Sequence, residues 1–335
     1  MLDLKEKTHG TLKMALVADD LTRVCLSHEC RTMSVTPWNY KPVFKFWKPD
    51  ILFVETTWRG RWNSWRYKMA SYADHPERNN RDLARAVAAA RDANIPAVFW
   101  NREDGVHFDR FIDSAKLFDR VLTVDERMLP RYREALGPDE KIGVMMFAAS
   151  STLHAPRPDD VLRRASFIGS YSSQTHLERR LWQDKMFLSA EAIGMTVYDR
   201  NSGRRATHYR YPDHPWIEVR SAIPHGMTAE IYRRHAINLN VNTITDSRTA
   251  FSRRLVEIIA VGGLALTNLT PAVSNMFEKY CVATNDAEKA KQVFERISHE
   301  GLSKNDIQKT RAGSDCVMRY HTWRHRLDQV LEFAT

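Results

Sequence analysis

The sequence has few cysteines, no long apolar run and no apolar leader. Four of its 335 residues are cysteine, with no CxxC pair and no zinc-ligand spacing: Cys25, Cys30, Cys281 and Cys316. We therefore expect reduced, mostly buried thiols. No apolar stretch approaches the roughly 18 residues that a membrane span needs. The first ten residues, MLDLKEKTHG, are too polar for a signal peptide. Together these absences predict a cytoplasmic protein.

Positive charge, by contrast, is in surplus. Lysine and arginine total 50 against 41 acidic residues, which gives a net charge of +9. Most of the surplus lies in 161–335, with 25 basic and 18 acidic residues, against 25 and 23 in 1–160. The second half also holds five Arg-Arg pairs, at 163–164, 179–180, 204–205, 233–234 and 253–254. This pattern predicts a polyanionic partner: nucleotide phosphates, nucleic acid or an anionic membrane surface. For any single pair, solvated surface arginine is the alternative.

Short apolar runs alternate with helical segments in both halves of the chain. The expected strands are 14–18, 50–55, 95–100, 120–124 and 143–147, then 165–169, 195–198, 237–242, 264–268 and 280–284. The expected helices are 81–93, 175–193, 226–235, 252–261, 286–298 and 315–333. This alternation predicts an α/β protein with parallel sheets built from βαβ units. Because 148–164 is rich in Ser, Pro and charge, we expect a linker there between two doubly wound domains. In such sheets ligands bind beyond the carboxyl ends of the strands.

The segment ASFIGSYSSQTHLERRLW (165–182) is the first candidate for a ligand site. A strand, a turn at Gly169 and Ser170, and a helix are expected in that order. A glycine lets the backbone approach a ligand closely, and a helix N-terminus presents free N–H groups to an anion. Arg179 or Arg180 would lie about one turn into this helix, on the phosphate side. An ordinary turn with a surface arginine pair is the alternative.

The segment 238–268 is the second candidate. Its strand carries alternating asparagines, Asn238, Asn240 and Asn242, and Ser252 is a suitable N-cap for the helix that follows. The first turn of that helix offers N–H groups together with Arg253 and Arg254, which suits a diphosphate. Glu257 lies one turn further on, where its carboxylate can accept hydrogen bonds from a ribose diol. A half-buried pair with Arg253 is the alternative.

The sequence resembles the CgeB-like, spore-maturation-protein-type glycosyltransferases in six blocks spread over 14–333. In chain order these are VADDLTRVCLSHEC, PDILFVETTWRG, VFWNREDGVHFDRFI, FIGSYSSQTHLERR, NVNTITDSRTAFSRRLVEIIAVGGLALTN and YHTWRHRLDQVL. The resemblance implies a GT-B fold, with two Rossmann-like domains facing a central cleft. It implies an acceptor-binding domain over 1–155, a nucleotide-sugar-binding domain over 156–314, and a C-terminal helix in 315–335 that crosses back to the first domain.

The resemblance also implies roles for individual residues. Glu257 would hold the donor ribose, while Arg253 or Arg254 and the Gly169–Ser170 turn would hold the diphosphate. Related enzymes often place a second acidic residue eight positions before that glutamate, in contact with the donor sugar. Position 249 of this sequence is Thr. The usual contact to the sugar hydroxyls is therefore not predicted here.

The strand at 95–100 runs without a turn residue into Asn101, Glu103, Asp104 and His107. In a GT-B enzyme this strand end faces the acceptor, whose hydroxyl needs a positioned base. We predict that Asp104 is the base or positions the acceptor, that His107 assists, and that Glu103 and Asn101 lie beside them. This assignment assumes inversion at the anomeric carbon. A helix N-cap at Asp104 and a structural role for His107 are the alternatives.

Two further stretches compete for roles on the acceptor side. Asp19 and Asp20 follow the first strand directly and could supply the base instead, or cap the next helix. The segment ETTWRGRWNSWRYK (55–68) interleaves three tryptophans with arginines. Of these we expect Trp58, Arg59 and Trp62 to contact an acceptor, because aromatic faces suit sugar rings and, with arginine, nucleobases and phosphates. Core tryptophans with solvated arginines are the alternative.

The expected activity follows from the resemblance. No DxD motif stands where a metal-dependent nucleotide-sugar enzyme would need one, so we expect no metal and no cofactor beyond a UDP-type sugar donor. We give His321 and His325 structural roles. The expected enzyme is a hexosyl- or pentosyltransferase acting on a cell-surface or spore glycan precursor, with its basic surface against an anionic membrane. Alternatives are a glycosyltransferase acting on a hydroxylated base of phage-type DNA, and a binding protein of the same fold without catalysis.

Overall fold

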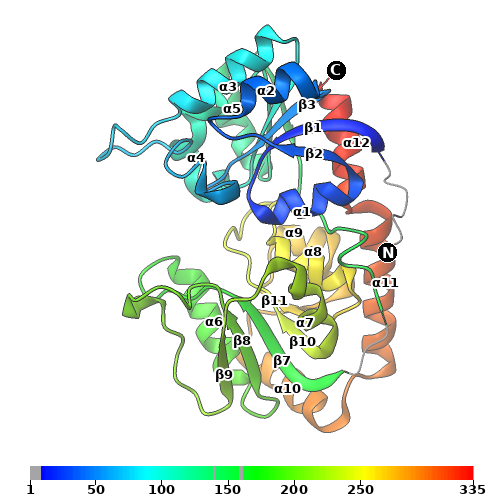
Figure 1. The fold of residues 1–335 in the computed structure, drawn as a ribbon. Coiled ribbons are helices and arrows are strands. Elements are labelled where there is room, and N and C mark those ends of the chain that lie inside the picture. Colours follow the sequence, from blue (N-terminus) through cyan, green and yellow to red (C-terminus); the bar gives the residue numbers. More distant parts are fainter. Residues whose placement is uncertain (1–8, 139, 158–160, 335) are drawn as a thin grey trace. The chain divides into compact units, whose positions relative to one another are not determined.

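The computed structural model describes residues 9–138, 140–157 and 161–334. The chain forms two compact units (Figure 1). Unit 1 contains the described residues up to Met146 together with the segment that begins at Trp323, and unit 2 is Phe147–Thr322. The change of unit at 146–147 comes just before the segment whose composition indicates a linker. Residues 158–160 of that segment lie outside the described part of the chain.

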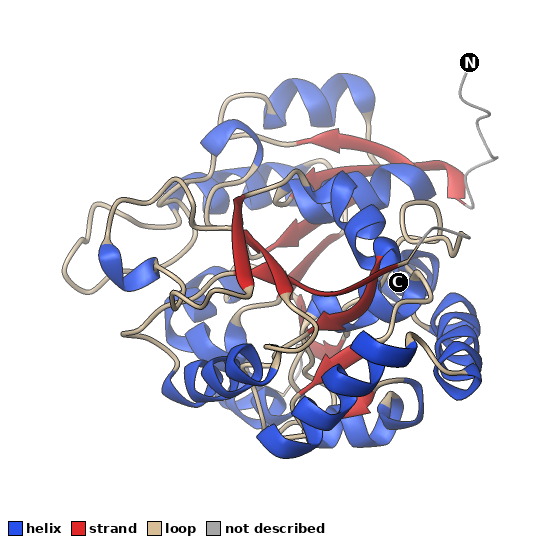
Figure 2. Ribbon diagram, turned by 90° about the horizontal axis from the view of Figure 1, so that it is seen from below, coloured by secondary structure: helices blue, strands red, loops and turns tan. Residues whose placement is uncertain are grey.

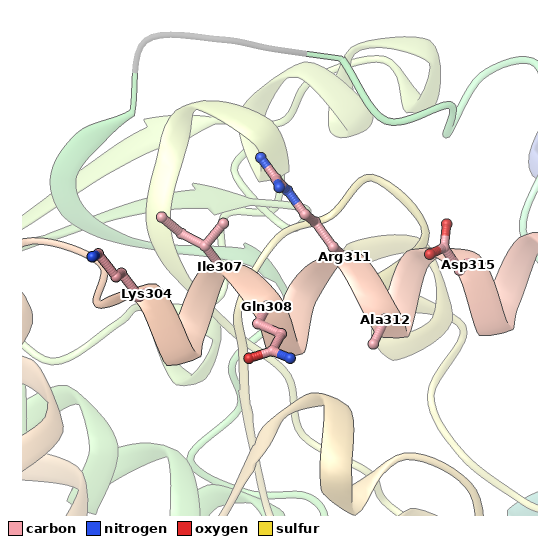
Figure 3. Close-up of a pocket in the computed structure, with 6 residues that line it drawn as sticks. All are labelled: Lys304, Ile307, Gln308, Arg311, Ala312 and Asp315. Carbon is pink, nitrogen blue, oxygen red and sulfur yellow. The ribbon is translucent and has the colours of Figure 1, made fainter.

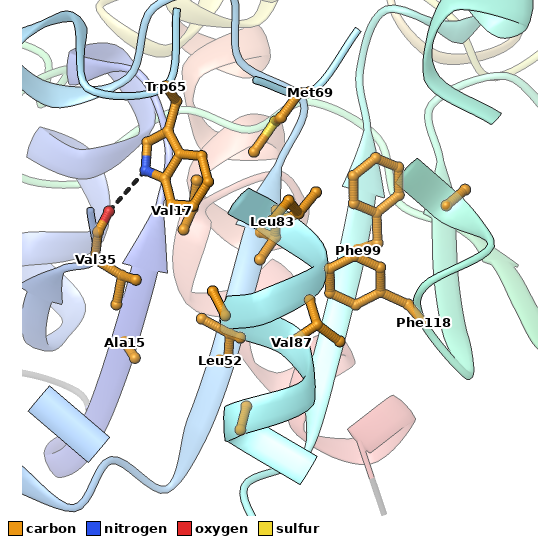
Figure 4. Packing of buried hydrophobic residues seen from close by; sticks show 14 of the residues in the cluster. Ala15, Val17, Val35, Leu52, Trp65, Met69, Leu83, Val87, Phe99 and Phe118 are labelled. Carbon is orange, nitrogen blue, oxygen red and sulfur yellow. Dashed lines mark hydrogen bonds between the residues drawn. The ribbon is translucent and has the colours of Figure 1, made fainter. Parts of the chain in front are cut away.

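Unit 1 is built on a six-stranded parallel sheet in the order β2-β1-β3-β4-β5-β6. Its strands are β1 His9–Val17, β2 Cys30–Ser34, β3 Ile51–Glu55, β4 Ala97–Asn101, β5 Arg120–Thr123 and β6 Lys141–Val144. The helices of this unit are α1 Asp20–Glu29, α2 Tyr40–Pro42, α3 Arg81–Asp92, α4 Asp104–Ala115, α5 Leu129–Leu136 and α12 Trp323–Ala334. The alanine-rich α3 lays Leu83 and Val87 against the sheet beside Phe99 (Figure 4).

Unit 2 repeats this plan with a sheet in the order β12-β11-β10-β7-β8-β9, again parallel throughout. Its strands are β7 Leu162–Gly169, β8 Met195–Asp199, β9 Ile217–Ser221, β10 His235–Leu239, β11 Ala265–Thr267 and β12 Val282–Ala283. The helices are α6 Leu177–Ser189, α7 Thr228–Arg234, α8 Arg253–Ala260, α9 Pro271–Met276, α10 Ala287–Glu300 and α11 Lys304–Tyr320. In Figure 2 the helices lie beside the strands in the layered pattern of an α/β fold.

The expected α/β fold with two parallel sheets is confirmed. Two strands were missed, β2 and β9, both of which lie at sheet edges and are mostly exposed or half-buried. The helix expected over 315–333 is wrong, since the structure has α11 and α12 with a break at His321–Thr322. There the backbone pairs with Ala149, whose N–H donates to the His321 carbonyl at 2.9 Å. A contact between such distant positions leaves no local signal in the sequence.

The last helix, α12, packs within unit 1. The indole rings of Trp323 and Trp100 meet edge to face with centroids 5.6 Å apart. Arg326 Nε donates to the Met146 carbonyl at 2.9 Å, and Gln329 Nε2 to the Val144 carbonyl at 2.6 Å. None of the helices in the described part of the chain is both long and apolar enough to cross a membrane.

Each sheet has one point where the order of strands reverses. In unit 1 the chain goes from β1 to β2 on one side and then to β3 on the other side of β1. In unit 2 it goes from β7 through β8 to β9 and then to β10 on the other side of β7. Because the two connections leave such a point in opposite directions, a crevice opens beyond the carboxyl ends of the two strands. The β1/β3 and β7/β10 strand ends are therefore the places to look for sites.

Candidate functional site

The β7/β10 strand ends of unit 2 bring together residues from both candidate segments of the sequence. Gly169 ends β7 where a side chain would not fit. A Cβ atom there would lie 2.4 Å from Cζ of Phe167 and 3.0 Å from Nη2 of Arg254. Glycine suits this position because the ring of Phe167, and behind it an arginine from α8, occupy the space that a Cβ atom would take.

Two arginines converge on this turn, one from each of two helices. Arg254 donates from Nε to the Ile168 carbonyl at 2.7 Å and from Nη1 to Oδ1 of Asn240 at 3.4 Å. Arg179, near the start of α6, donates from Nη2 to the Ser170 carbonyl at 3.1 Å. These bonds hold both guanidinium groups at the carboxyl edge of the sheet.

The two guanidinium groups make no direct ion pair within the described part of the chain. In the described residues neither Arg179 nor Arg254 forms an ion pair with a carboxylate, and Nε of Arg179 is buried without a hydrogen-bond partner. Burial, then repulsion from Arg254, lowers the pKa of Arg179 to about 10. Burial also lowers the pKa of Arg254, and Arg200, directly after β8, repels both groups. Cations held together against their own repulsion form a site for an anion.

A ladder of amides shapes the neighbouring loop. Asn240 donates to Oγ1 of Thr267 at 2.9 Å, and Asn242 donates to Oδ1 of Asn268 at 3.0 Å. The side-chain oxygen of Asn242, Oδ1, accepts a hydrogen bond from the backbone N–H of Ser252 at 2.7 Å. Ser252 is the N-cap residue of α8 as expected, although its side chain makes no capping bond. The alternating asparagines thus position the start of α8 rather than stand free for a ligand.

Glu257 is buried, 3% exposed, and is paired within its own helix. Arg253 Nε donates to Oε1 at 2.7 Å, and Nε2 atoms of His225 and His154 lie 3.5 and 3.9 Å from the same oxygen. Burial alone would raise the pKa of this carboxyl. Attraction to Arg253, followed by the two histidines, outweighs burial and lowers it to about 2. Glu257 is therefore a fixed negative charge beside the arginine cluster.

The group His154, His225 and Glu257 has ligand atoms within 4.8 Å of one another, a spacing that a metal ion could use. However, Nδ1 of His154 accepts a hydrogen bond from the Ser150 N–H at 3.1 Å. A neutral imidazole that accepts at Nδ1 carries its proton on Nε2, so Nε2 has no lone pair for a metal. Burial lowers the pKa of both histidines, to about 4 for His225. The geometry thus favours neutral rings facing Glu257.

The structure separates the members of the two arginine pairs. Arg179 and Arg254 face the anion site, whereas Arg180 Nη1 donates to the Ser173 carbonyl on the outer side and Arg253 binds Glu257. Sequence reasoning missed Arg200, Tyr211, His154 and His225 in this region. The hydroxyl of Tyr211 is buried beside the cluster with no hydrogen-bond partner. The position of Arg200 directly after a strand was a usable signal; the histidines had none.

In unit 1 the β1/β3 strand ends carry an ionic network around Asp19. Its carboxylate accepts from the Thr57 hydroxyl, from the Gly60 N–H at 2.9 Å, and from Arg102 Nη2 at 2.5 Å. Arg102 Nε also lies 3.3 Å from Oε1 of the buried Glu55. Burial lowers the pKa of Arg102, but Glu55, Glu103 and Asp19 together raise it. Of these residues only Asp19 and Glu103 were named from the sequence.

The residues that follow β4 lie differently from expectation. Helix α4 begins at Asp104, so this residue is in the first turn and is not the cap. Its side chain is 1% exposed, with Oδ2 accepting from the Tyr132 hydroxyl at 3.1 Å. Asn101 is also fully buried and donates to the same hydroxyl at 2.8 Å. Asp104 and Asn101 are therefore buried in unit 1 against Tyr132 of α5.

The other acceptor-side candidates remain at the surface. Asp20 is exposed and pairs with Arg23, with Oδ1 2.9 Å from Nη2. His107 is half-buried and meets the ring of Trp58 edge-on, with centroids 5.3 Å apart. Trp65, by contrast, is buried and its indole N–H donates to the Val35 carbonyl at 2.8 Å (Figure 4). Trp62 and Arg59 are exposed. The segment 55–68 thus contains both a core tryptophan and surface ones.

Two hollows of the surface lie away from these strand ends. One, of about 460 Å³, runs along α11 and is lined by Lys304, Ile307, Gln308, Arg311, Ala312 and Asp315 (Figure 3). The other lies in unit 1 at the amino ends of β4 and β5, beside Ile95–Ala97 and Leu117–Arg120. The amino ends are the edge of a parallel sheet opposite to the ligand-binding edge. Neither hollow includes the residues described above.

Comparison with known proteins supports a relation to glycosyltransferases. Residues 179–332 match the family model described as glycosyl transferase-like. No curated protein matches the chain. Among solved structures, a glycosyltransferase from Rickettsia africae has a TM-score of 0.56 at 12% identity, covering 96% of this chain and 89% of that one. Anabaena HepE in complex with UDP has a TM-score of 0.57 at 11% identity, covering 96% and 91%.

A third similar structure is a DNA-modifying β-glucosyltransferase, determined with and without its substrate uridine diphosphoglucose. Its TM-score is 0.55 at 12% identity, and the match covers 96% of this chain and 99% of that chain. At such low identity these likenesses show the fold alone. The fold of this chain is GT-B, with two units that each contain a parallel six-stranded sheet.

Proposed function

We propose that this protein is a glycosyltransferase that takes its sugar from a nucleoside diphosphate sugar, a UDP-sugar in the first instance. The observation that carries the proposal is the arginine cluster at the β7/β10 strand ends, where Arg179 and Arg254 converge with no carboxylate of the described residues paired to either, and where Arg200 lies near enough to repel both. A diphosphate supplies the missing negative charge at the place where α/β sheets bind nucleotides. The family model over 179–332 and the UDP-bound Anabaena structure of the same fold are consistent with this.

The reaction that suits this site is displacement at the anomeric carbon. The bond between that carbon and the diphosphate oxygen breaks, a bond to the acceptor oxygen forms, and the acceptor proton passes to a base. Negative charge grows on the leaving diphosphate, and guanidinium groups already aimed there stabilise it without reorganising. We propose that Arg179 and Arg254 do this in place of a metal ion. Activity is then expected to survive EDTA.

Glu257 is proposed to face the ribose of the donor. It stays ionised because attraction to Arg253, above all, lowers its pKa to about 2, and a fixed carboxylate is a good acceptor for hydroxyl donors. The pair with Arg253 orients it from the preceding turn of α8. A hexosyl donor and a CgeB-like relationship are part of the same proposal.

On the acceptor side we propose that the base stands at the β1/β3 edge of unit 1. Asp19, Asp20 and His107 reach the surface there, whereas Asp104 is interior. Asp19 is held by Arg102, Thr57 and Gly60, and these contacts fix the position of its carboxylate. Turnover of Asp19→Asn, Asp20→Asn and His107→Gln ranks the three candidates.

For the acceptor we propose a hydroxyl on a cell-surface or spore glycan precursor. A hydroxylated base of DNA is the second candidate, because the chain carries a net charge of +9 and shares its fold with a DNA-modifying glucosyltransferase over 99% of that chain. The two differ in salt dependence. Duplex binding that falls steeply with salt concentration would favour DNA.

A thermal-shift panel of UDP, GDP, dTDP and CMP tests the donor proposal. At about 100 times Kd a bound nucleotide stabilises by about 2.7 kcal/mol. We expect one nucleotide to shift the wild type and Arg180→Gln, but not Arg254→Gln or Glu257→Ala. Arg180 is the matched control because it neighbours Arg179 in α6 and faces away. No shift with any nucleotide would contradict the proposal.

A further inference from the structure

An exposed aromatic and cationic surface lies on unit 1, beside the carboxyl edge of its sheet. It is formed by Trp38, Arg61, Trp62, Arg66, Tyr67 and Lys68, and we call it the Trp62 surface. Trp38 and Trp62 are 72% and 73% exposed, and Tyr67 is 38% exposed. A large apolar ring costs free energy when it is left in water. Three such rings close together on one surface indicate a partner.

Each aromatic ring of this surface has a cation over its face. The Arg61 guanidinium carbon lies 4.1 Å from the centroid of Trp62, and that of Arg66 lies 4.7 Å from Tyr67. Lys68 Nζ lies 5.7 Å from the ring of Trp38. The stretch 56–73 contains four basic residues and no acidic one. A ligand on this surface would therefore meet flat apolar faces and positive charge side by side.

Contacts above and below the loop hold this surface in place. Arg61 Nη1 lies 3.4 Å from the Ser34 hydroxyl at the end of β2, next to the turn that carries Trp38. Below the loop, Trp65 is buried and bonded to the Val35 carbonyl. The loop also keeps three side-chain-bearing residues in the left-handed region, Trp62, Asn63 and Tyr67, with φ of 57°, 59° and 62°. Bulky residues rarely accept this strain, and it is concentrated at functional sites.

The same loop is bonded to the edge where we place the acceptor hydroxyl. Asp19 accepts the Thr57 hydroxyl and the Gly60 N–H, the two ends of the turn that leads to Arg61 and Trp62. The Trp62 surface is thus connected through one short turn to the β1/β3 strand ends. A long acceptor chain could place a hydroxyl at those ends and lay its neighbouring units on the rings.

We propose that the Trp62 surface binds an anionic glycan, a saccharide chain that carries carboxylate or phosphate groups, and that this chain is the acceptor of the proposed sugar transfer. The apolar face of a pyranose ring packs on Trp62 and Trp38, and Arg61, Arg66 and Lys68 meet its acidic groups. The role of this glycan as the acceptor rests on the proposed function, but its binding to the Trp62 surface does not.

Charge density favours a glycan over nucleic acid. Duplex DNA carries one negative charge per about 1.7 Å of its axis and is bound by dense basic surfaces. Here the cations are few and partly compensated, because Lys68 pairs with Asp82 and the exposed Asp74 and Glu77 follow directly in the chain. A membrane fits less well too, because Trp62 could enter the lipid only by taking the Arg61 guanidinium, 4.1 Å from its ring centroid, out of water. A sparsely charged polymer of rings matches both features.

The test measures the affinity of the whole chain for four probes: alginate as an acidic polysaccharide, dextran as a neutral one, a single-stranded oligonucleotide, and phosphatidylserine vesicles. We expect alginate to bind and dextran not to bind. Trp62→Ala should raise the Kd for alginate at least tenfold, with Trp62→Phe between it and the wild type. Phe46→Ala is the matched control, because Phe46 is 75% exposed under Lys45 but precedes the amino end of β3, at the opposite edge of the sheet.

Three results would overturn the inference. The first is that alginate does not bind. The second is that Phe46→Ala lowers the affinity for alginate as much as Trp62→Ala does. The third is that the oligonucleotide or the vesicles bind more tightly than alginate and that this binding depends on Trp62. Binding of UDP, measured on the same samples, separates this inference from the proposed function. If UDP binds and alginate does not, only the surface assignment fails. If alginate binds through Trp62 and no nucleotide binds, the surface stands and the transferase proposal fails.

Discussion

Arg253 and Glu257 form a buried ion pair one turn apart on α8, with Nε 2.7 Å from Oε1. Both side chains are within unit 2, at 9% and 3% exposure. Burying two charges costs free energy that a good hydrogen bond only partly returns, so such a pair is weak evidence for stability. This pair lies near Arg179 and Arg254, which form no ion pair in the described residues, and beside two histidines. Such a cluster of buried charges indicates a functional site. Its energetics can be measured with single substitutions.

Glu257→Gln is expected to lower the free energy of unfolding by about 3 kcal/mol at pH 7, because it removes the negative charge that the buried Arg253 guanidinium binds. The folded pKa of Glu257 is about 2, below its unfolded value. Its contribution is therefore complete above the unfolded pKa and is lost as the pH falls toward 2. Urea denaturation from pH 7 to pH 3 should show the gap between wild type and variant narrowing. A gap that is constant with pH would contradict the lowered pKa.

Arg179→Gln is expected to stabilise the nucleotide-free protein while weakening nucleotide binding by tenfold or more. Removing one of the converging cations relieves repulsion with Arg254 and Arg200, which act on Arg179 in the folded state. The same cation is needed when a diphosphate is bound. Melting temperatures with and without UDP measure both effects. Arg180→Gln, on the outer side, should change neither, and a destabilised Arg179→Gln would show that the arginine serves the fold.

Asp104→Asn is expected to raise the free energy of unfolding at pH 8 by about 3 kcal/mol. Burial raises the pKa of Asp104 to about 7, although hydrogen bonds from Thr123 and Tyr132 oppose it. Stability contributed by a raised pKa is complete below the unfolded pKa and is lost as the pH rises through about 7. The advantage of the variant should therefore be absent near pH 4 and largest above pH 7. The control is Asp109→Asn, which changes an aspartate of the same helix whose side chain is 84% exposed.

Turnover of the same variant separates two roles for Asp104. Asp104 has a buried carboxyl that accepts from the Tyr132 hydroxyl, so turnover of Asp104→Asn should stay within about threefold of wild type. Asp20→Asn or Asp19→Asn should then lose at least tenfold. Loss of turnover in Asp104→Asn with the fold intact would return the base to Asp104 and require α4 to open.

Gly169→Ala is expected to destabilise the protein by about 1–3 kcal/mol, as overpacking does. The added Cβ would lie 2.4 Å from the buried ring of Phe167, and moving that ring displaces Arg254, whose guanidinium rests on it at 4.8 Å. Nucleotide affinity should fall in the same variant. Gly203→Ala, where a Cβ meets nothing within 4 Å, is the control. An unchanged melting temperature for Gly169→Ala would contradict the close packing at the end of β7.

The local sequence pattern was sufficient to predict most strands of this protein and the position of one candidate site. Apolar runs located ten of the twelve strands in the described residues, and the glycine at the end of β7 and the arginine pair after Ser252 led to the β7/β10 strand ends. It failed where the information was not local. The edge strands β2 and β9 lack a continuous apolar run, and the break between α11 and α12 depends on Ala149, more than 170 positions away.

The sequence by itself determined the α/β class, the two parallel sheets and the surplus of arginine, because these depend on periodicity and composition. Only the tertiary structure decided which arginine of each pair faces the strand ends, because neighbouring residues of a helix point about 100° apart and packing selects between them. Tertiary structure also turned Asp104 inward and left Trp62 outside. The choice between core and surface for a polar or aromatic side chain is made by what packs over it, and those residues lie elsewhere in the chain.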